Sequence, residues 1–281
     1  MIMEKKRIKE VKEYFKKKAK YYDDVDEQSY WVFSDTLLWV LLKKLVLPHI
    51  NKNSKILDAG GGTARWSVKI VEEIGCKATV YDISKDMLQI AQEKIETLGL
   101  KNNFNVIEGD IEDMSTIGDN TYDLTICFHN VLGFVDSPER AIKEMVRVTK
   151  KGGVIAIIPP NKYHSFYFNI YRGEFKQLDM NLIENKVQFT DTVPKMHTFT
   201  PDGLKNLFKK NGINPIKVLG FPVSVYPGIE ETKLHGETQM LKNIFADKTI
   251  FEKLLGIEQE LCMNEDAAGR GNMLLAIGKK L

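Results

Sequence analysis

The chain has 281 residues, of which 43% are hydrophobic and 28% are charged, and its formal net charge is +2. These values are ordinary for a soluble globular protein with one large domain. The small net charge gives no bulk electrostatic reason to expect a nucleic acid or a membrane as a partner. The cysteines, Cys76, Cys127 and Cys262, lie far apart, so the sequence predicts neither a disulfide framework nor a zinc site and favours a reducing cytoplasm.

Residues 1–50 are expected to form an N-terminal helical cap, with helices over 4–20 and 34–47. The first helix is rich in lysine, and its apolar residues Ile8, Val11, Tyr14 and Phe15 recur at helical spacing. This pattern indicates that the lysines form a solvated face of an ordinary helix. Ser34 or Asp35 is expected to cap the second helix. The charged residues 4–9 do not resemble a signal peptide, and the apolar stretch 37–47 is too short to span a bilayer.

From residue 54 the predicted strands and helices alternate. Strands are expected at 55–57, 78–81, 104–107, 122–128 and 154–158, helices at 64–74, 85–98 and 138–149, and a turn at 150–153. Ser84 and Gly99 are expected at the two ends of the helix over 85–98, and Pro138 in the first turn of the next. This alternation predicts an α/β fold with a doubly wound, mostly parallel sheet, whose ligands bind beyond the carboxyl ends of the strands.

A glycine-rich turn connects the first strand to its helix. Gly60, Gly61 and Gly62 can adopt positive φ and let a ligand approach the backbone closely. The unpaired amide groups at the start of the following helix favour an anionic or electron-rich ligand. Such turns also occur with nothing bound, so the turn alone is weak evidence for a cofactor site.

Carboxylates end the first three predicted strands, at Asp58, Asp82 and Asp110. A carboxylate at Asp82 could accept both hydroxyls of a ribose, which suits NAD and S-adenosylmethionine equally. Asp110 would be within reach of an adenine amino group, and a third acidic residue at this edge is less expected of a dinucleotide enzyme. Together with the glycine turn, the three carboxylates predict a site for a nucleotide-type cofactor.

These motifs resemble those of the class I S-adenosylmethionine-dependent methyltransferases, across residues 50–160 and more loosely to the end of the chain. The matching stretches are residues 57–63, 81–88, 109–114, 122–124 and 151–153. The resemblance implies a Rossmann-like methyltransferase fold with a seven-stranded sheet, an antiparallel last strand and helical insertions. Segments 216–219 and 272–277 could form the closing hairpin, and residues 51–160 would be the core that binds S-adenosyl-L-methionine.

The resemblance also implies which residues contact the cofactor. Gly60 and Gly62 would pass its methionine part, and Asp82 would hold its ribose. Tyr22 resembles an N-terminal tyrosine that covers the cofactor in some relatives. The full implied set is Tyr22, Asp58, Gly60, Gly61, Gly62, Asp82, Ile83, Met87, Asp110, Ile111 and His129.

Two positions depart from the family pattern. Ala64 stands where a third glycine is often found, and a small side chain should be tolerated there. Phe134 stands where many relatives that act on small molecules have a histidine, so no general base can be carried over to that position.

Residues 161–199 are expected to form an aromatic-rich insertion or lid that encloses a small substrate, with a homodimer surface as the alternative (Tyr163, Phe166, Tyr167, Phe168, Tyr171 and Phe175). Residues 200–281 would complete the core, with a helical insertion at 230–261. Aromatic rings could hold a cationic amine, whereas Arg172 or Arg270 could meet a carboxylate.

Methyl transfer from a sulfonium is a direct displacement, in which a base is optional when the acceptor is a neutral amine. His129 follows the fourth strand, near the expected position of the methyl group, and is the candidate catalytic residue; the alternative is a histidine that only packs or contacts the cofactor. His164 and His197 are secondary candidates, and the spacing of the three predicts no metal site.

The leading hypothesis is a methyltransferase that acts on N or O of a small organic molecule. One alternative is an RNA methyltransferase that uses the basic N-terminal helix, although no separate RNA-binding module is visible. An NAD-dependent oxidoreductase and a non-catalytic cofactor-binding subunit are further alternatives.

Overall fold

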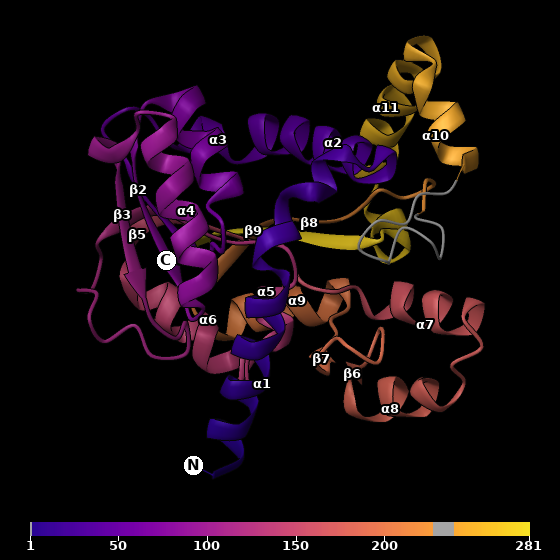
Figure 1. The fold of residues 1–281 in the computed structure, drawn as a ribbon, viewed down its shortest axis with the longest axis horizontal. Coiled ribbons are helices and arrows are strands. Elements are labelled where there is room, and N and C mark those ends of the chain that lie inside the picture. Colours follow the sequence, from indigo (N-terminus) through magenta and orange to yellow (C-terminus); the bar gives the residue numbers. More distant parts are fainter. Residues whose placement is uncertain (1, 227–238) are drawn as a thin grey trace.

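The computed structural model describes residues 2–226 and 239–281, and its centre is a seven-stranded sheet in the order β3-β2-β1-β4-β5-β9-β8 (Figure 1). The strands are β1 (Lys55–Ala59), β2 (Lys77–Asp82), β3 (Phe104–Glu108), β4 (Tyr122–Cys127), β5 (Thr149–Ile157), β8 (Ile213–Phe221) and β9 (Met273–Lys280). Strands β1 to β5 pair in parallel, and β9 pairs antiparallel with both β5 and β8. The predicted doubly wound sheet with an antiparallel last strand is therefore confirmed.

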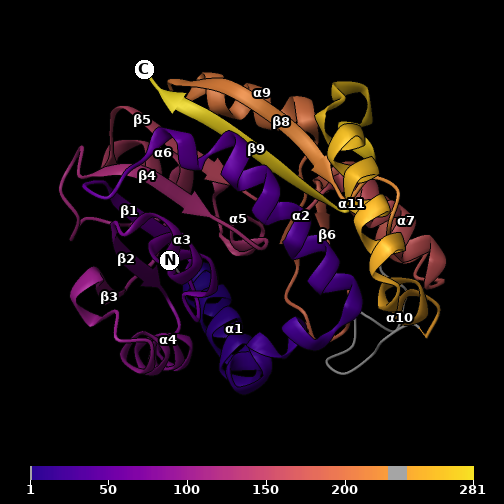
Figure 2. The same cartoon turned by 90° about the horizontal axis from the view of Figure 1, so that it is seen from above.

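Helices cover both faces of this sheet (Figure 2). One face packs against α2 (Ser29–Leu45), α3 (Arg65–Ile74) and α11 (Lys248–Met263), and the other against α6 (Pro138–Val148) and α9 (Pro201–Lys210). Successive side chains of a strand point to opposite faces, so Ile56 joins the first core and Leu57 the second. Helix α4 (Lys85–Thr97) packs beside α3 through a smaller apolar cluster. With both faces covered, the carboxyl ends of the strands are where a ligand can approach the sheet.

The predicted helix caps of the core are confirmed. The Ser84 hydroxyl accepts a hydrogen bond from the Met87 amide at 3.4 Å, and Gly99, just beyond α4, has φ of +71°. Pro138 lies in the first turn of α6. These local signals are set by nearby residues, which is why the sequence is sufficient to place them.

The N-terminal segment differs from the prediction. Helix α1 (Ile2–Lys18) leads into a 3-10 helix, η1 (Ala19–Glu27), and α2 begins at Ser29 rather than at residue 34. The predicted cap at Ser34 or Asp35 is therefore wrong, because both residues lie inside α2 and are buried. The buried rings of Tyr30 and Phe33 extend the apolar face of α2 by a further turn, so packing sets the start of the helix.

The predicted turn at 150–153 is also wrong, because β5 already begins at Thr149. Gly152 has φ of +73°, and the pairing register shifts opposite Tyr122 and Leu124. The paired glycines thus produce an irregularity within the strand instead of ending it.

The remaining elements are short helices and a two-stranded sheet in the segments that connect the elements above. They are η2 (Leu47–His49), η3 (Lys101–Asn103), α5 (Val131–Phe134), α7 (Lys162–Tyr171), α8 (Lys176–Glu184), β6 (Lys186–Val187), β7 (Met196–His197), α10 (Gln239–Ala246) and η5 (Glu265–Arg270). The predicted helical insertion at 230–261 is helical from Gln239, and its residues 230–238 lie outside the described residues. Across the described ranges, no helix has the length and apolarity needed to cross a membrane.

Candidate active site

The glycine turn closes tightly onto the end of β2. Gly60 and Gly62 have φ of +75° and +53°, and the Gly60 amide donates to the Tyr81 carbonyl at 2.7 Å. A Cβ on Gly60 would lie 2.3 Å from the Val131 Cγ1 atom, so a larger residue would force the turn away from α5. Ala64 also has positive φ, at 63°, which costs about 1 kcal/mol for an alanine.

A pocket that is partly open to solvent adjoins this turn at the carboxyl ends of the strands, and its empty space, including the part that is open solvent, is about 690 Å³. Nine of the eleven residues predicted to contact the cofactor line it: Tyr22, Gly60, Gly62, Asp82, Ile83, Met87, Asp110, Ile111 and His129. The other two, Asp58 and Gly61, support the turn from outside the pocket lining. A Cβ on Gly61 would lie 2.7 Å from the Asp58 carboxyl carbon, so the glycine allows the buried carboxyl group to fit there.

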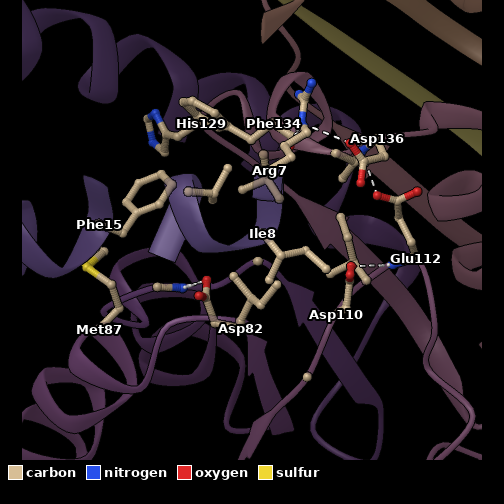
Figure 3. Close-up of a pocket in the computed structure, with 18 of the residues that line it drawn as sticks. Arg7, Ile8, Phe15, Asp82, Met87, Asp110, Glu112, His129, Phe134 and Asp136 are labelled. Atoms are coloured by element: carbon tan, nitrogen blue, oxygen red, sulfur yellow. Dashed lines mark hydrogen bonds and ion pairs between the residues drawn. The ribbon is translucent and has the colours of Figure 1, made fainter. Parts of the chain in front are cut away.

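Asp82 is held rigidly at the floor of the pocket (Figure 3). One carboxylate oxygen accepts the Gly62 amide at 2.9 Å, and the other accepts the Ser84 amide at 2.8 Å. Burial raises the pKa of Asp82, and these hydrogen bonds oppose that shift. Because each carboxylate oxygen has two lone pairs, both can still accept a hydroxyl group of a ligand.

Helix α1 forms a roof over the pocket, which the sequence reasoning did not predict. Ile8, Val11 and Phe15 line the pocket from one face of this helix. Arg7 fastens the roof: its guanidinium donates to the Phe134 carbonyl at 2.8 Å and the Gly133 carbonyl at 3.0 Å. The signal was present in the apolar spacing i, i+3, i+7 along α1, which requires a buried face.

Phe134 has a packing role that accounts for the departure from the family pattern. Its ring centroid lies 5.3 Å from that of Phe15 and 6.0 Å from that of Tyr14. A histidine at this position would weaken the apolar contact between α5 and the roof.

His129 lies at the pocket wall with its backbone in the left-handed region, at φ of +52°. Its Nε2 atom accepts a hydrogen bond from the Trp66 indole N–H, so the neutral ring carries its proton on Nδ1. Burial, with a smaller contribution from the nearby Arg65 charge, lowers the pKa of His129 to about 3. The imidazole is therefore neutral at physiological pH, and the lone pair that a base would use is occupied.

The secondary histidine candidates lie apart from this pocket, His164 on α7 and His197 on β7. Burial is the main cause that lowers the pKa of each to about 4. The six aromatic residues singled out in the insertion do not line the pocket, and several are exposed (Tyr163, Tyr167, Tyr171 and Phe175). Within residues 2–226 and 239–281, no group of three or more potential ligands is arranged to hold a metal ion.

The residues present fit a cationic nucleotide-type cofactor. Asp82, Asp110, Glu112 and Asp136 line the pocket together with Arg7, so carboxylates outnumber basic side chains in its lining. Such a lining favours a positively charged ligand such as a sulfonium. Sheet order, glycine turn and pocket together define a Rossmann-like enzyme that binds a nucleoside-containing cofactor.

Comparison with known proteins identifies the family. Residues 56–153 match a methyltransferase domain model. The chain is 30% identical over 189 residues to a demethylmenaquinone methyltransferase of Staphylococcus epidermidis, covering 62% of this chain and 73% of the relative. It is 23% identical over 252 residues to the tRNA 5-carboxymethoxyuridine methyltransferase of Escherichia coli (strain K12), covering 87% of both chains.

Among solved structures, a possible histamine N-methyltransferase from Thermotoga maritima superposes with a TM-score of 0.59 at 19% identity, over 96% of this chain and 99% of that one. This similarity confirms the fold. The chain belongs to the class I S-adenosylmethionine-dependent methyltransferases, and its cofactor is S-adenosyl-L-methionine.

Proposed function

We propose that this enzyme transfers the methyl group of S-adenosylmethionine to a nitrogen or oxygen atom of a small organic molecule by direct displacement. The observation that carries the proposal is the roofed pocket, in which α1 and the glycine turn enclose the space beside His129. Its lining combines apolar side chains with a few convergent polar groups, which is typical of a site for a small ligand.

In this proposal the predicted residues hold the cofactor. Asp82 accepts the ribose hydroxyls, and the side chains of Ile83 and Met87 flank the adenine, with Ile111 beside Asp110 at its far edge. Asp110 accepts from the amino edge of the adenine. The bound cofactor supplies an electrophilic methyl group on a positively charged sulfur, and the chain supplies position and electrostatic support.

Direct displacement is supported by the state of the cysteines. Cys76, Cys127 and Cys262 are all buried, and none lines the pocket. Burial raises the pKa of the Cys127 thiol, which is the one at the end of β4. A covalent intermediate on a cysteine thiolate is therefore disfavoured.

We propose that His129 orients the cofactor or the acceptor rather than removing a proton. Its Nε2 lone pair already accepts from Trp66, and the low pKa makes the imidazole a weak base. An acceptor that arrives as a neutral amine or as a carboxylate needs no base during the displacement.

A second candidate acceptor is an RNA nucleoside. The alignment with the tRNA methyltransferase of Escherichia coli extends over 87% of both chains, which is more than the core of residues 51–160 alone. The demethylmenaquinone relative matches 62% of this chain. An RNA acceptor would enter the same pocket and add contacts outside it.

The test uses S-adenosylmethionine with a labelled methyl group and three acceptor sets: small amines, carboxylic acids and phenols; total RNA; and a quinol. Label in a small heteroatom acceptor, with the product identified by mass spectrometry, supports the leading proposal. Label that enters only RNA, in a reaction that slows steeply with salt, favours the second candidate. Label only on a ring carbon of the quinol contradicts both.

A further inference from the structure

Asp23 connects the N-terminal segment to the glycine turn. It lies in η1, and its two carboxylate oxygens bind groups from two different elements. The Thr63 hydroxyl donates to Oδ1 at 2.8 Å, and the Lys94 ammonium of α4 lies 2.7 Å from Oδ2. One side chain therefore joins η1, the glycine turn and α4.

The partner in the glycine turn is buried and lies next to the pocket. Thr63 is 0% exposed and directly follows Gly62, whose amide is held by Asp82. A displacement of the Asp23 carboxylate would therefore move Thr63 and, with it, the neighbouring Gly62 amide that donates to Asp82. An ion pair confined to the surface would not have this connection to the pocket.

On its other side, Asp23 is bonded through the backbone to Tyr22, which lines the pocket. The Tyr22 ring lies 6.5 Å from the Phe15 ring of the roof, centroid to centroid. Burial raises the pKa of Tyr22, so its hydroxyl remains protonated at physiological pH. The hydrogen bond from Thr63 to Asp23 thus fixes the position of the neighbouring Tyr22 relative to the glycine turn.

We propose that Asp23 is a positioning residue that couples the shape of the glycine turn to the placement of Tyr22 over the bound cofactor. The proposal rests on the placement of the cofactor given above. When the turn adopts the conformation that holds the cofactor, Thr63 presents its hydroxyl to Asp23 and η1 docks. When the turn is distorted, this contact is lost and Tyr22 is no longer held over the pocket.

The experiment measures the affinity for S-adenosylhomocysteine by calorimetry in the wild type and in Asp23→Asn, Thr63→Val, Lys94→Met and the double variant Asp23→Asn with Thr63→Val. We expect about tenfold weaker binding for Asp23→Asn, similar weakening for Thr63→Val, and little additional loss in the double variant. Asp24→Asn is the matched control, because Asp24 is the neighbouring carboxylate and does not line the pocket.

Two readouts separate positioning from a merely structural role. The melting temperature without ligand should stay within about 2 °C of the wild type in Asp23→Asn, because the ion pair with Lys94 is partly accessible to solvent and such pairs contribute little to stability. Added S-adenosylhomocysteine should slow hydrogen exchange of residues 19–24 in the wild type, but much less in Asp23→Asn. If Asp23→Asn lowers the melting temperature strongly, Lys94→Met provides the same affinity test.

Binding by Asp23→Asn at wild-type affinity, or losses that multiply in the double variant, would overturn the proposal. Asp82→Asn serves as the reference for the cofactor placement itself. If Asp82→Asn weakens binding and Asp23→Asn does not, the positioning role alone fails. If neither variant weakens binding, the cofactor lies elsewhere and both proposals fail.

Discussion

Replacing Asp82 by asparagine should weaken the binding of S-adenosylhomocysteine while leaving the fold intact. The Asp82 carboxylate accepts the Gly62 amide at 2.9 Å and the Ser84 amide at 2.8 Å. In the proposed complex it also accepts the ribose hydroxyls. Hydrogen bonds to a charged group contribute about 1.5–3 kcal/mol, whereas neutral ones contribute about 1 kcal/mol. Loss of the charge should therefore remove about 0.5–2 kcal/mol for each hydroxyl group that the side chain accepts, which corresponds to roughly 2- to 30-fold weaker binding per hydrogen bond.

The stability of the variant should change less than its affinity. An asparagine keeps one accepting oxygen for the two backbone amides, and the other amide then faces the side-chain NH₂ group. Burial raises the pKa of Asp82, so the ionised carboxylate carries a desolvation cost that the amide group avoids. These two effects oppose each other, and the melting temperature should shift by only a few degrees.

The assay is a calorimetric titration with S-adenosylhomocysteine, alongside thermal unfolding without ligand. Asp86→Asn is the matched control, since Asp86 is an exposed carboxylate on the first turn of α4. Unchanged affinity in Asp82→Asn would refute the assignment of the ribose to this carboxylate. An equal loss in Asp86→Asn would show that the effect is a general loss of negative charge.

Two further predictions concern buried titratable groups. Replacing Trp66 by phenylalanine removes the indole N–H that donates to the His129 Nε2 atom, so the pKa of His129 should rise from about 3 by roughly half a unit to one unit. An NMR titration follows this pKa, and an unchanged value would contradict the hydrogen bond. Burial raises the pKa of Asp58 to about 7, above its value in the unfolded chain, so the folded state holds more protons between about pH 4 and 7 and loses stability as pH rises through that range. Asp58→Asn does not titrate, so its free energy of unfolding in urea, minus that of the wild type, should be larger at pH 8 than at pH 5. The increase should be on the order of 1.4 kcal/mol per unit of pKa shift spanned. The same difference at both pH values would refute this prediction.

The core of the fold could be predicted because its signals are local. Ser84, Pro138 and the glycine turn each set a helix end or a strand end through neighbouring residues alone. The start of α2 could not be predicted in this way, because Tyr30 and Phe33 join that helix through burial against distant parts of the chain. The turn expected at 150–153 failed because the strand is paired with β4 on both sides of these residues, at Thr149 and again from Val154, so they form an irregularity within β5.

The candidate site was predictable on the side built by the strands and unpredictable on the side of the roof. Asp82 ends β2, and Asp110 follows the end of the adjacent parallel strand β3 by two residues, so topology alone brings them to one edge. Arg7 meets the Phe134 and Gly133 carbonyls more than a hundred residues away, and backbone carbonyls leave no mark in a sequence. The sequence pattern shows that α1 has an apolar face, but it does not show which part of the protein this face packs against.

The most direct test of the account is a crystal structure of the enzyme with S-adenosylhomocysteine. We expect the ribose hydroxyls on the Asp82 carboxylate, the adenine beside Ile83 and Met87, and Tyr22 and α1 closed over the ligand. A ligand bound outside this pocket, or one that displaces α1 and leaves Asp82 without a ribose contact, would contradict the account.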